Sequence, residues 1–338
     1  IFRSTDGSFN QGYEAIAYAA DMGYKVLNLS WGGANAYSRF GQDMINYAVL
    51  EKDVVVVAAA GNSGQQEDFY PASFENVLSV AQSDNNGNRI GATTSSYFVD
   101  LMAPGQGIFT TAENDTYQLA SGSSLATPLV AGTAALMRAR FPDMSARQIM
   151  EKLRLSARDV YDQSANSSYA ETLGNGFLDM ARAVSEQVTP ALRMTSFQYE
   201  NQNHVGLYAF YGDTLSIRTT ITNFLSPASG AKVTLSSPSE YVHMLDSVFS
   251  IGSLDSMAQL GNHDQPFRLR LSEDTPPLEQ LYFRLAYQAD GYTDYQYFFI
   301  VISPDYTELD NGVIRLSLGS QAQIGKGLAR DGLIFRGD

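Results

Sequence analysis

The sequence predicts an α/β domain with a parallel sheet, followed by a mainly-β domain. Helical and strand patterns alternate along the first half, residues 54–60 are apolar without polar alternation, and helical periodicity stops near Val188. Alternating helices and strands are typical of a parallel sheet with helices on both faces, and an uninterrupted apolar strand is typical of its buried centre. A chain of 338 residues has room for two domains. We place the boundary at 185–192, which separates domains 1–188 and 189–338.

The first elements alternate between helix and strand. Residues 11–22 predict a helix that ends at Gly23, and its apolar positions share one face: Tyr13, Ile16, Ala17 and Ala20. Residues 25–30 predict a short strand that ends before paired glycines. A second helix over about 41–52 then leads into the apolar strand 54–60.

The strand pattern recurs before two further helices. Residues 77–81 and 99–104 repeat the apolar run and predict two more strands of the same sheet. A long helix is expected from about Ser124 to Phe141, because Pro142 cannot continue it. The next helix, over 145–157, begins with Ser145, a favourable N-cap residue.

Strand patterns replace helical ones after residue 189. Asp290-Gly291 is a hairpin signal between two of these segments. Turns at intervals of about ten residues predict a β-sandwich of the immunoglobulin or fibronectin-like kind. Residues 312–338 either complete this sandwich or begin a further module. The strand-like segments are 207–211, 214–222, 231–237, 267–272, 281–288 and 295–303.

Tyrosine and phenylalanine are dense in the β-rich region. Alternate spacing favours packing in a sandwich core, and the alternative is an adhesion or substrate-docking face. The aromatic residues concerned are Tyr208, Phe210, Tyr211, Tyr282, Phe283, Tyr295, Tyr297, Phe298 and Phe299.

Composition excludes several classes of function. The net charge of −14 is spread evenly, with 20 acids and 12 bases up to residue 190 and 16 and 10 after it, so no basic face for nucleic acid is expected. The absence of cysteine excludes disulfides and thiol catalysis. No apolar run is long enough to span a membrane, and the first residues show no signal peptide. A mature secreted chain would look the same, so composition leaves the compartment open.

Small residues surround Ser124 at the start of the expected long helix, in the segment Ser121–Gly132. A nucleophile at a helix N-terminus gains free backbone N–H groups and a favourable dipole, and small neighbours let a substrate backbone approach. The alternative is a capped, alanine-rich core helix without chemistry.

Two strand ends add polar groups to the expected carboxyl edge of the sheet. Asn62 follows the apolar strand in the turn Ala60-Gly61-Asn62, where its amide N–H is a candidate oxyanion donor. The segment Ser30-Trp31-Gly32-Gly33 ends another strand and leaves an edge to which an extended peptide can add. Taken singly, each segment is more typical of an ordinary turn.

Together and in this order, these segments resemble the subtilisin-like serine peptidases (subtilases). Residues 122–128, GSSLATP, are similar to the family's serine motif, with Ser123 in place of threonine. The resemblance implies that Ser124 is the nucleophile, that Asn62 stabilises the oxyanion, and that Ser30, Trp31, Gly32, Gly33, Ala60 and Gly61 bind the substrate. Further matches lie at 70–72, 77–80, 103–105 and 174–179, so the resemblance covers about residues 1–188.

The family's Asp and His motifs are absent. The three histidines, His204, His243 and His263, all lie in the β-rich region, and a serine without its base is a weak nucleophile. We expect the chain to be the C-terminal part of a subtilase catalytic domain plus an accessory domain. The Asp and His would then lie upstream of Ile1, and this chain alone would be inactive. The alternative is a truncated or degenerate subtilase that binds or scaffolds without catalysis.

The resemblance also bears on substrate, ions and location. Phe69 falls where the family lines the pocket for the residue before the scissile bond, which predicts a shallow pocket for small or medium side chains; alternatively, Glu67 and Asp68 select basic residues. The substrate would be a protein or peptide, and the enzyme secreted or at the cell surface. No metal ligand is assigned, although carbonyls near Ala72, Phe74 and Val77 would suit a structural Ca²⁺ ion.

Overall fold

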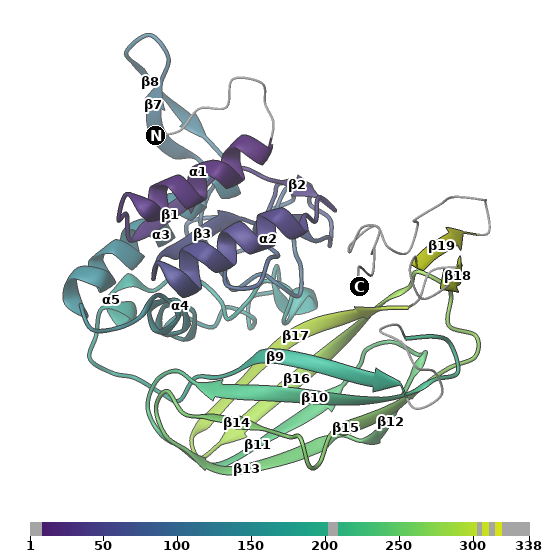
Figure 1. Ribbon diagram of the computed structural model, residues 1–338. Coiled ribbons are helices and arrows are strands. Elements are labelled where there is room, and N and C mark those ends of the chain that lie inside the picture. Colours follow the sequence, from purple (N-terminus) through teal and green to yellow (C-terminus); the bar gives the residue numbers. More distant parts are fainter. Residues whose placement is uncertain (1–8, 202–208, 303–305, 311–314, 320–338) are drawn as a thin grey trace. The chain divides into compact units, whose positions relative to one another are not determined.

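The computed structural model describes residues 9–201, 209–302, 306–310 and 315–319. The chain divides into two compact units, Ile1–Thr189 and Pro190–Asp338 (Figure 1). Each unit has its own sheets, and each is described by itself below.

A parallel sheet of four strands forms the centre of the first unit. Its order is β1-β3-β5-β6, and every neighbouring pair is parallel. All five residues of β3 are buried, and successive side chains of a strand point to opposite faces, so both faces of the sheet are covered. The apolar run therefore forms the buried strand that the sequence predicts. The strand bounds are β1 Val26–Leu29, β3 Val55–Ala59, β5 Leu78–Ser83 and β6 Leu101–Pro104.

Helices pack around this sheet. The first, α1 (Phe9–Asp21), packs on α2 (Arg39–Asn46), and α2 continues into a π-helical turn, η1 (Tyr47–Glu51), which packs on β3. The expected single helix over 41–52 is thus two helical forms in sequence. The buried face of α1 contains Tyr13, Ile16 and Ala20, as expected, while Ala17 is only half-buried.

The long helix α3 (Ser123–Arg140) lies along all four strands, and α4 (Ala146–Leu155) packs on α3 and β3. The cap of α4 forms as expected: Ser145 Oγ accepts from the backbone N–H of Gln148, and Gln148 Oε1 accepts from that of Ser145. Two short elements, η2 (Ser167–Tyr169) and α5 (Met180–Ala183), complete the helices.

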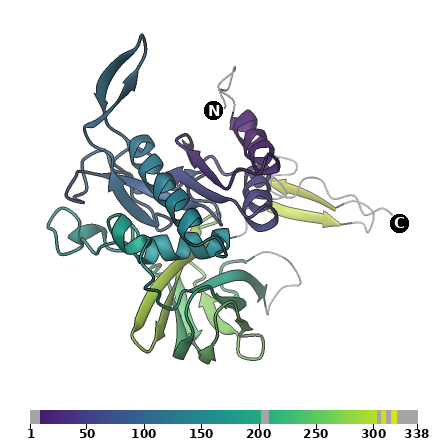
Figure 2. The ribbon, with the colours of Figure 1, turned by 90° about the vertical axis from the view of Figure 1, so that its left-hand side faces the viewer.

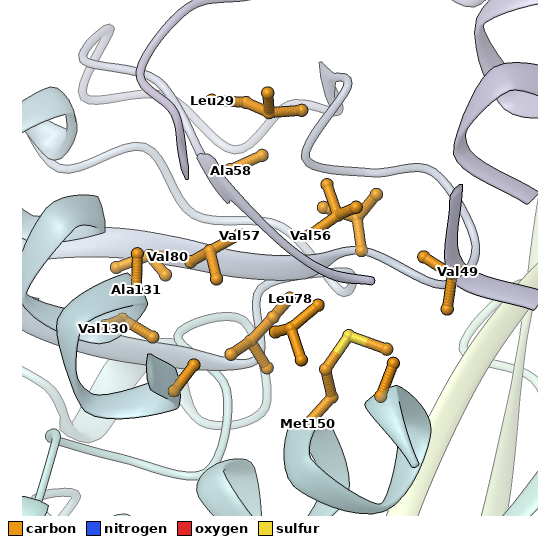
Figure 3. Close-up of a cluster of buried hydrophobic side chains, with 14 of the residues drawn as sticks. Leu29, Val49, Val56, Val57, Ala58, Leu78, Val80, Val130, Ala131 and Met150 are labelled. Atoms are coloured by element: carbon orange, nitrogen blue, oxygen red, sulfur yellow. The ribbon is translucent and has the colours of Figure 1, made fainter. Parts of the chain in front are cut away.

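The core of the first unit joins sheet and helices (Figure 3). Val57 and Val80, from adjacent strands, lie beside Val130 and Ala131 of α3, while Met150 of α4 lies beside Leu78. This layer holds α3 against the central strands of the sheet.

The first unit also contains two short antiparallel strand pairs outside its central sheet. β2 (Gly33–Ala34) pairs with β4 (Phe69–Tyr70), and β7 (Ile108–Ala112) pairs with β8 (Thr116–Ala120). The β7–β8 hairpin stands out from the rest of the unit (Figure 2). Because β8 ends at Ala120, the hairpin leads directly into α3.

Two large antiparallel sheets form most of the described part of the second unit. One has the order β12-β15-β10-β14, with β9 also paired to β10, and the other has the order β13-β11-β16-β17. β16 and β17 meet at the two-residue turn Asp290-Gly291, as expected, because Ala289 pairs with Tyr292. The strand bounds are β9 Leu192–Asn201, β10 Thr214–Asn223, β11 Ala228–Ser236, β12 Val242–Asp246, β13 Val248–Leu254, β14 Gln259–Gly261, β15 Phe267–Leu271, β16 Gln280–Ala289 and β17 Tyr292–Val301.

Aromatic side chains of the second unit are partly in its core. Phe283 and Phe298 are buried and their rings stack with centroids 5.2 Å apart, whereas Tyr211 is exposed. Four more are half-buried, namely Tyr282, Tyr295, Tyr297 and Phe299, as is Phe210, and Tyr208 lies outside the described residues. Farther along, β18 (Tyr306–Asp310) and β19 (Arg315–Gly319) form a hairpin of their own.

Among the helices that the structure describes, none has the length and apolarity needed to cross a membrane.

Candidate functional site

Ser124 lies in the first turn of α3. The preceding Gly122 has φ +155° and ψ 158°, a backbone conformation that is essentially restricted to glycine. Its N–H donates to the carbonyl of Gly105 at 2.8 Å, which joins the turn to the loop after β6. Ser124 is half-buried, and the first N–H groups of a helix have no partner within the helix. At the start of α3, the Ser123 N–H donates to Asn62 Oδ1, and the N–H groups of Leu125 and Ala126 donate to the Gly122 carbonyl. The sequence therefore places the Ser124 hydroxyl and the Ser124 N–H together in the first turn.

Ser124 and Ser30 make two reciprocal hydrogen bonds. The Ser124 hydroxyl donates to the carbonyl of Ser30 at 3.3 Å, and the Ser30 hydroxyl donates to the carbonyl of Ser124 at 2.9 Å. The side-chain amide of Asn28, in β1, donates to Ser30 Oγ at 2.9 Å. These bonds hold the end of β1 against the start of α3, and the Ser124 proton rests on a carbonyl oxygen rather than on a basic group.

Asn62 follows β3 and reaches the same helix start. Its Oδ1 accepts from the backbone N–H of Ser123 at 2.7 Å and from Gln82 Nε2 at 3.0 Å. An amide oxygen has two lone pairs, so both are used. Asn62 itself is exposed.

Ser123 makes a second connection between β3 and α3. Its buried Oγ accepts from the backbone N–H of Gly61 at 3.2 Å. Gly61 has φ +104°, where a side chain would be strained. Ser123, which stands where the resembling motif has threonine, thus accepts a hydrogen bond that positions the Gly61-Asn62 turn.

Phe69 lies against both segments that the resemblance assigns to substrate binding. A Cβ built on Gly32 would be 2.4 Å from Phe69 Cε1, and one built on Gly61 would be 2.9 Å from Cδ2. Only glycine leaves room for the ring at these two positions. Gly33 pairs with Tyr70, and Ala60, buried at the end of β3, donates its N–H to Val80.

Trp31 faces the protein rather than the strand edge. A Cβ on Gly12 would be 2.8 Å from Trp31 Cζ2, and the Trp31 ring meets that of Tyr13 at 5.3 Å, edge to face. Burial raises the pKa of Tyr13 to about 12. The indole therefore anchors its segment on α1.

Glu67 and Asp68, the two carboxylates that could select basic residues, differ in their surroundings. Asp68 is buried and accepts a hydrogen bond from Ser96 Oγ at 2.8 Å, whereas Glu67 is half-buried. Asp68 is thus already engaged within the protein.

Candidate bases and metal ligands are sparse. The sequence of the first unit contains no histidine. His243 and His263 are exposed residues of the second unit, and His204 lies outside the described residues. Within the described ranges, no three His, Cys, Asp or Glu side chains are grouped so as to hold a metal ion. A calcium site built from carbonyls stays a prediction.

Gln82 was missed by sequence reasoning. It is 1% exposed within β5, and its amide contacts Asn62. The available signal was a glutamine directly after the apolar run 77–81, which predicts a buried strand. A buried amide lowers stability unless it is hydrogen-bonded, so such a residue indicates a polar partner nearby.

Comparison with known proteins gives consistent results. The sequence model of the Subtilase family matches residues 1–176. Thermitase from Thermoactinomyces vulgaris is 44% identical over 134 residues, covering 40% of this chain and 47% of thermitase. Subtilisin DY from Bacillus licheniformis is 35% identical over 163 residues, covering 47% of this chain and 59% of the subtilisin. The chain therefore spans about half the length of these curated relatives.

Among solved structures, the prenylagaramide maturation protease PagA aligns with a TM-score of 0.49 and 25% identity. The alignment covers 54% of this chain and 69% of PagA.

Proposed function

Because this chain belongs to the subtilase family, we propose that it forms part of a serine endopeptidase in which Ser124 is the nucleophile and Asn62 an oxyanion donor. The observation that carries this proposal is the orientation of Asn62. Its oxygen is bound by Ser123 N–H and by Gln82 Nε2, so the Nδ2 hydrogens of this exposed side chain would be the part left to donate to a substrate at the start of α3.

The proposed reaction is acyl transfer to serine. Ser124 Oγ attacks the carbonyl carbon of the scissile peptide and gives its proton to a base, while the carbonyl oxygen becomes an oxyanion. The oxyanion accepts from Asn62 Nδ2 and the Ser124 N–H. Collapse expels the amine, which takes the proton from the base. Water then hydrolyses the acyl-enzyme by the same steps in reverse order.

The base and its orienting acid would lie outside these 338 residues. The first unit has no histidine, and the Ser124 hydroxyl donates to a carbonyl. We place the His and Asp on a segment upstream of Ile1, and we call the longer protein that contains it the parent protein. The 338-residue chain alone would be inactive, because a serine without its base is a weak nucleophile near neutral pH.

The peptide would lie between two backbone segments, Ser30–Gly33 and Ala60–Gly61, by adding to a strand edge. The Phe69 ring against Gly32 and Gly61 would leave room for a small or medium side chain before the scissile bond. The engagement of Asp68 with Ser96 favours this preference over selection of basic residues.

The second unit would be an accessory domain with an immunoglobulin or fibronectin-like sandwich, and the parent protein would be secreted or at the cell surface. The two antiparallel sheets, in contact through Phe197 of β9 and Phe298 of β17, support the sandwich. The proposed location is tested by cell fractionation with a cytoplasmic marker. Detection of the parent protein in the cell interior alone would refute secretion or cell-surface location.

The test is peptide hydrolysis by the parent protein. Ser124→Ala should reduce kcat by several orders of magnitude, since removal of a catalytic serine leaves only the oxyanion hole and binding. The matched control is Ser121→Ala, whose hydroxyl accepts from the Gly107 N–H just before β7 at 2.9 Å; this change should be neutral. Equal activity of wild type and Ser124→Ala would contradict the proposal.

The second candidate function is non-catalytic binding, and the absence of histidine from the first unit favours it. A parent sequence without the upstream His and Asp, together with absent hydrolysis, would establish this alternative.

A further inference from the structure

We infer that Gln82 is a positioning residue that holds the Asn62 amide in the orientation needed to donate to an oxyanion. This inference rests on the proposed function, since it assigns Gln82 a part in the same step. It concerns a residue that does not contact the substrate and acts through Asn62.

The Gln82 amide can bind in one orientation only. Its Nε2 donates to Asn62 Oδ1 at 3.0 Å and to the carbonyl of Ala92 at 3.1 Å. Its buried Oε1 has no partner within the described part of the chain. Rotating the amide by half a turn would place Oε1 opposite two acceptors, so the bonds determine which atom faces Asn62.

Gln82 in turn determines how Asn62 is oriented. Asn62 is exposed, and exposed side chains exchange rotamers freely unless they are held. Two donors hold its oxygen, namely Ser123 N–H on one side and Gln82 on the other. If Gln82 is removed, one hydrogen bond remains and the amide can rotate about it.

The backbone at Gly105 lies close to both Gln82 and the turn before Ser124. A Cβ built on Gly105 would lie 2.6 Å from Gln82 Cβ and 2.8 Å from the carbonyl of Gly122. Gly105 also joins both neighbours, because it donates its N–H to Ser83 and accepts from that of Gly122. Gln82 therefore occupies space beneath the turn that delivers Ser124, inside a strand that is otherwise apolar or small.

The test compares Gln82→Met with wild type in the parent protein. Methionine has nearly the same size but lacks the donor. We expect kcat to fall about fivefold to tenfold with KM within about twofold, since this hydrogen bond supports the transition state only; that change corresponds to ~1–1.4 kcal/mol.

A double-mutant cycle separates positioning from a general structural effect. In an Asn62→Ala background, Gln82→Met should leave kcat unchanged, because there is no amide left to orient. The matched control is Thr93→Val, which removes a buried hydrogen bond from Thr93 Oγ1 to the Gln82 carbonyl at 2.9 Å without touching Asn62; its kcat should stay near wild type. An equal loss in both backgrounds, or no loss in either, would overturn the inference.

A measurement without catalysis makes the result independent of the proposed function. The Asn62 side-chain ¹⁵N–¹H₂ order parameter, measured by NMR, should fall in Gln82→Met and stay unchanged in Thr93→Val. An unchanged order parameter in Gln82→Met overturns the inference. A parent protein that never hydrolyses peptides, but shows the expected fall, would instead refute the proposed function.

Discussion

Phe69 provides a sharp prediction about specificity. Its ring lies against Gly32 and Gly61. In the proposed complex, a substrate side chain would enter between the two backbone segments that contain these glycines. Phe69→Ala removes the ring and opens that space. Burying a phenylalanine side chain is worth about 1.5–3 kcal/mol, which corresponds to roughly 10- to 100-fold in rate. The ratio of kcat/KM for phenylalanine over alanine before the scissile bond should rise by that factor.

The assay is hydrolysis of a matched peptide series by the parent protein, with alanine, leucine or phenylalanine at that position. Phe74→Leu is the control, because the Phe74 ring packs on Tyr37 and Tyr70 instead, and its preference should stay that of wild type. A wild type that already prefers large aromatics, or a ratio unchanged in Phe69→Ala, would refute the reasoning.

Three further predictions concern stability and can be measured by chemical or thermal unfolding. Gly176→Ala should lower the free energy of unfolding by about 3 kcal/mol or more, because the new Cβ would lie 2.1 Å from the Arg158 carbonyl oxygen at φ +123°. The control is Gly132→Ala in α3, where nothing lies within 4 Å of the new Cβ and the change should be neutral or stabilising. Equal effects of the two substitutions would contradict the close approach at Gly176. Ser145→Ala should cost about 1 kcal/mol through loss of the α4 cap, and an unchanged midpoint would argue against it. Burial raises the pKa of Tyr13 to about 12 from 10.0, so the unfolded state releases this proton first and stability should fall as pH rises from 10 to 12. The fall should be smaller in Tyr13→Phe, and identical pH profiles would exclude Tyr13 as its source.

Elements with strong local sequence patterns could be predicted from the sequence. The strand β3 was predictable because an apolar run without alternation has to be covered on both faces. The start of α4 was predictable because Ser145 is a favourable N-cap residue, and the structure adds the reciprocal bond from Gln148. The resemblance also assigned Ser124 and Asn62 to one site, and the structure brings Asn62 to the backbone of the neighbouring Ser123.

Other features depend on contacts between distant residues. The two-residue strands β2 and β4 are too short to show periodicity, and η1 differs from an α-helix only in its hydrogen bonds. The packing of Trp31 on Gly12 and the bond from Gln82 to Asn62 join residues 19 or more positions apart. No local pattern encodes these contacts, because they arise when separate elements are packed together.

The central claim is that Ser124 is an activated nucleophile in the parent protein. The most direct measurement is labelling with a fluorophosphonate probe, followed by peptide mapping of the adduct by mass spectrometry. We expect one adduct, on Ser124, that is absent from Ser124→Ala and from the 338-residue chain alone. An unlabelled parent protein, or an adduct on another serine, would contradict it.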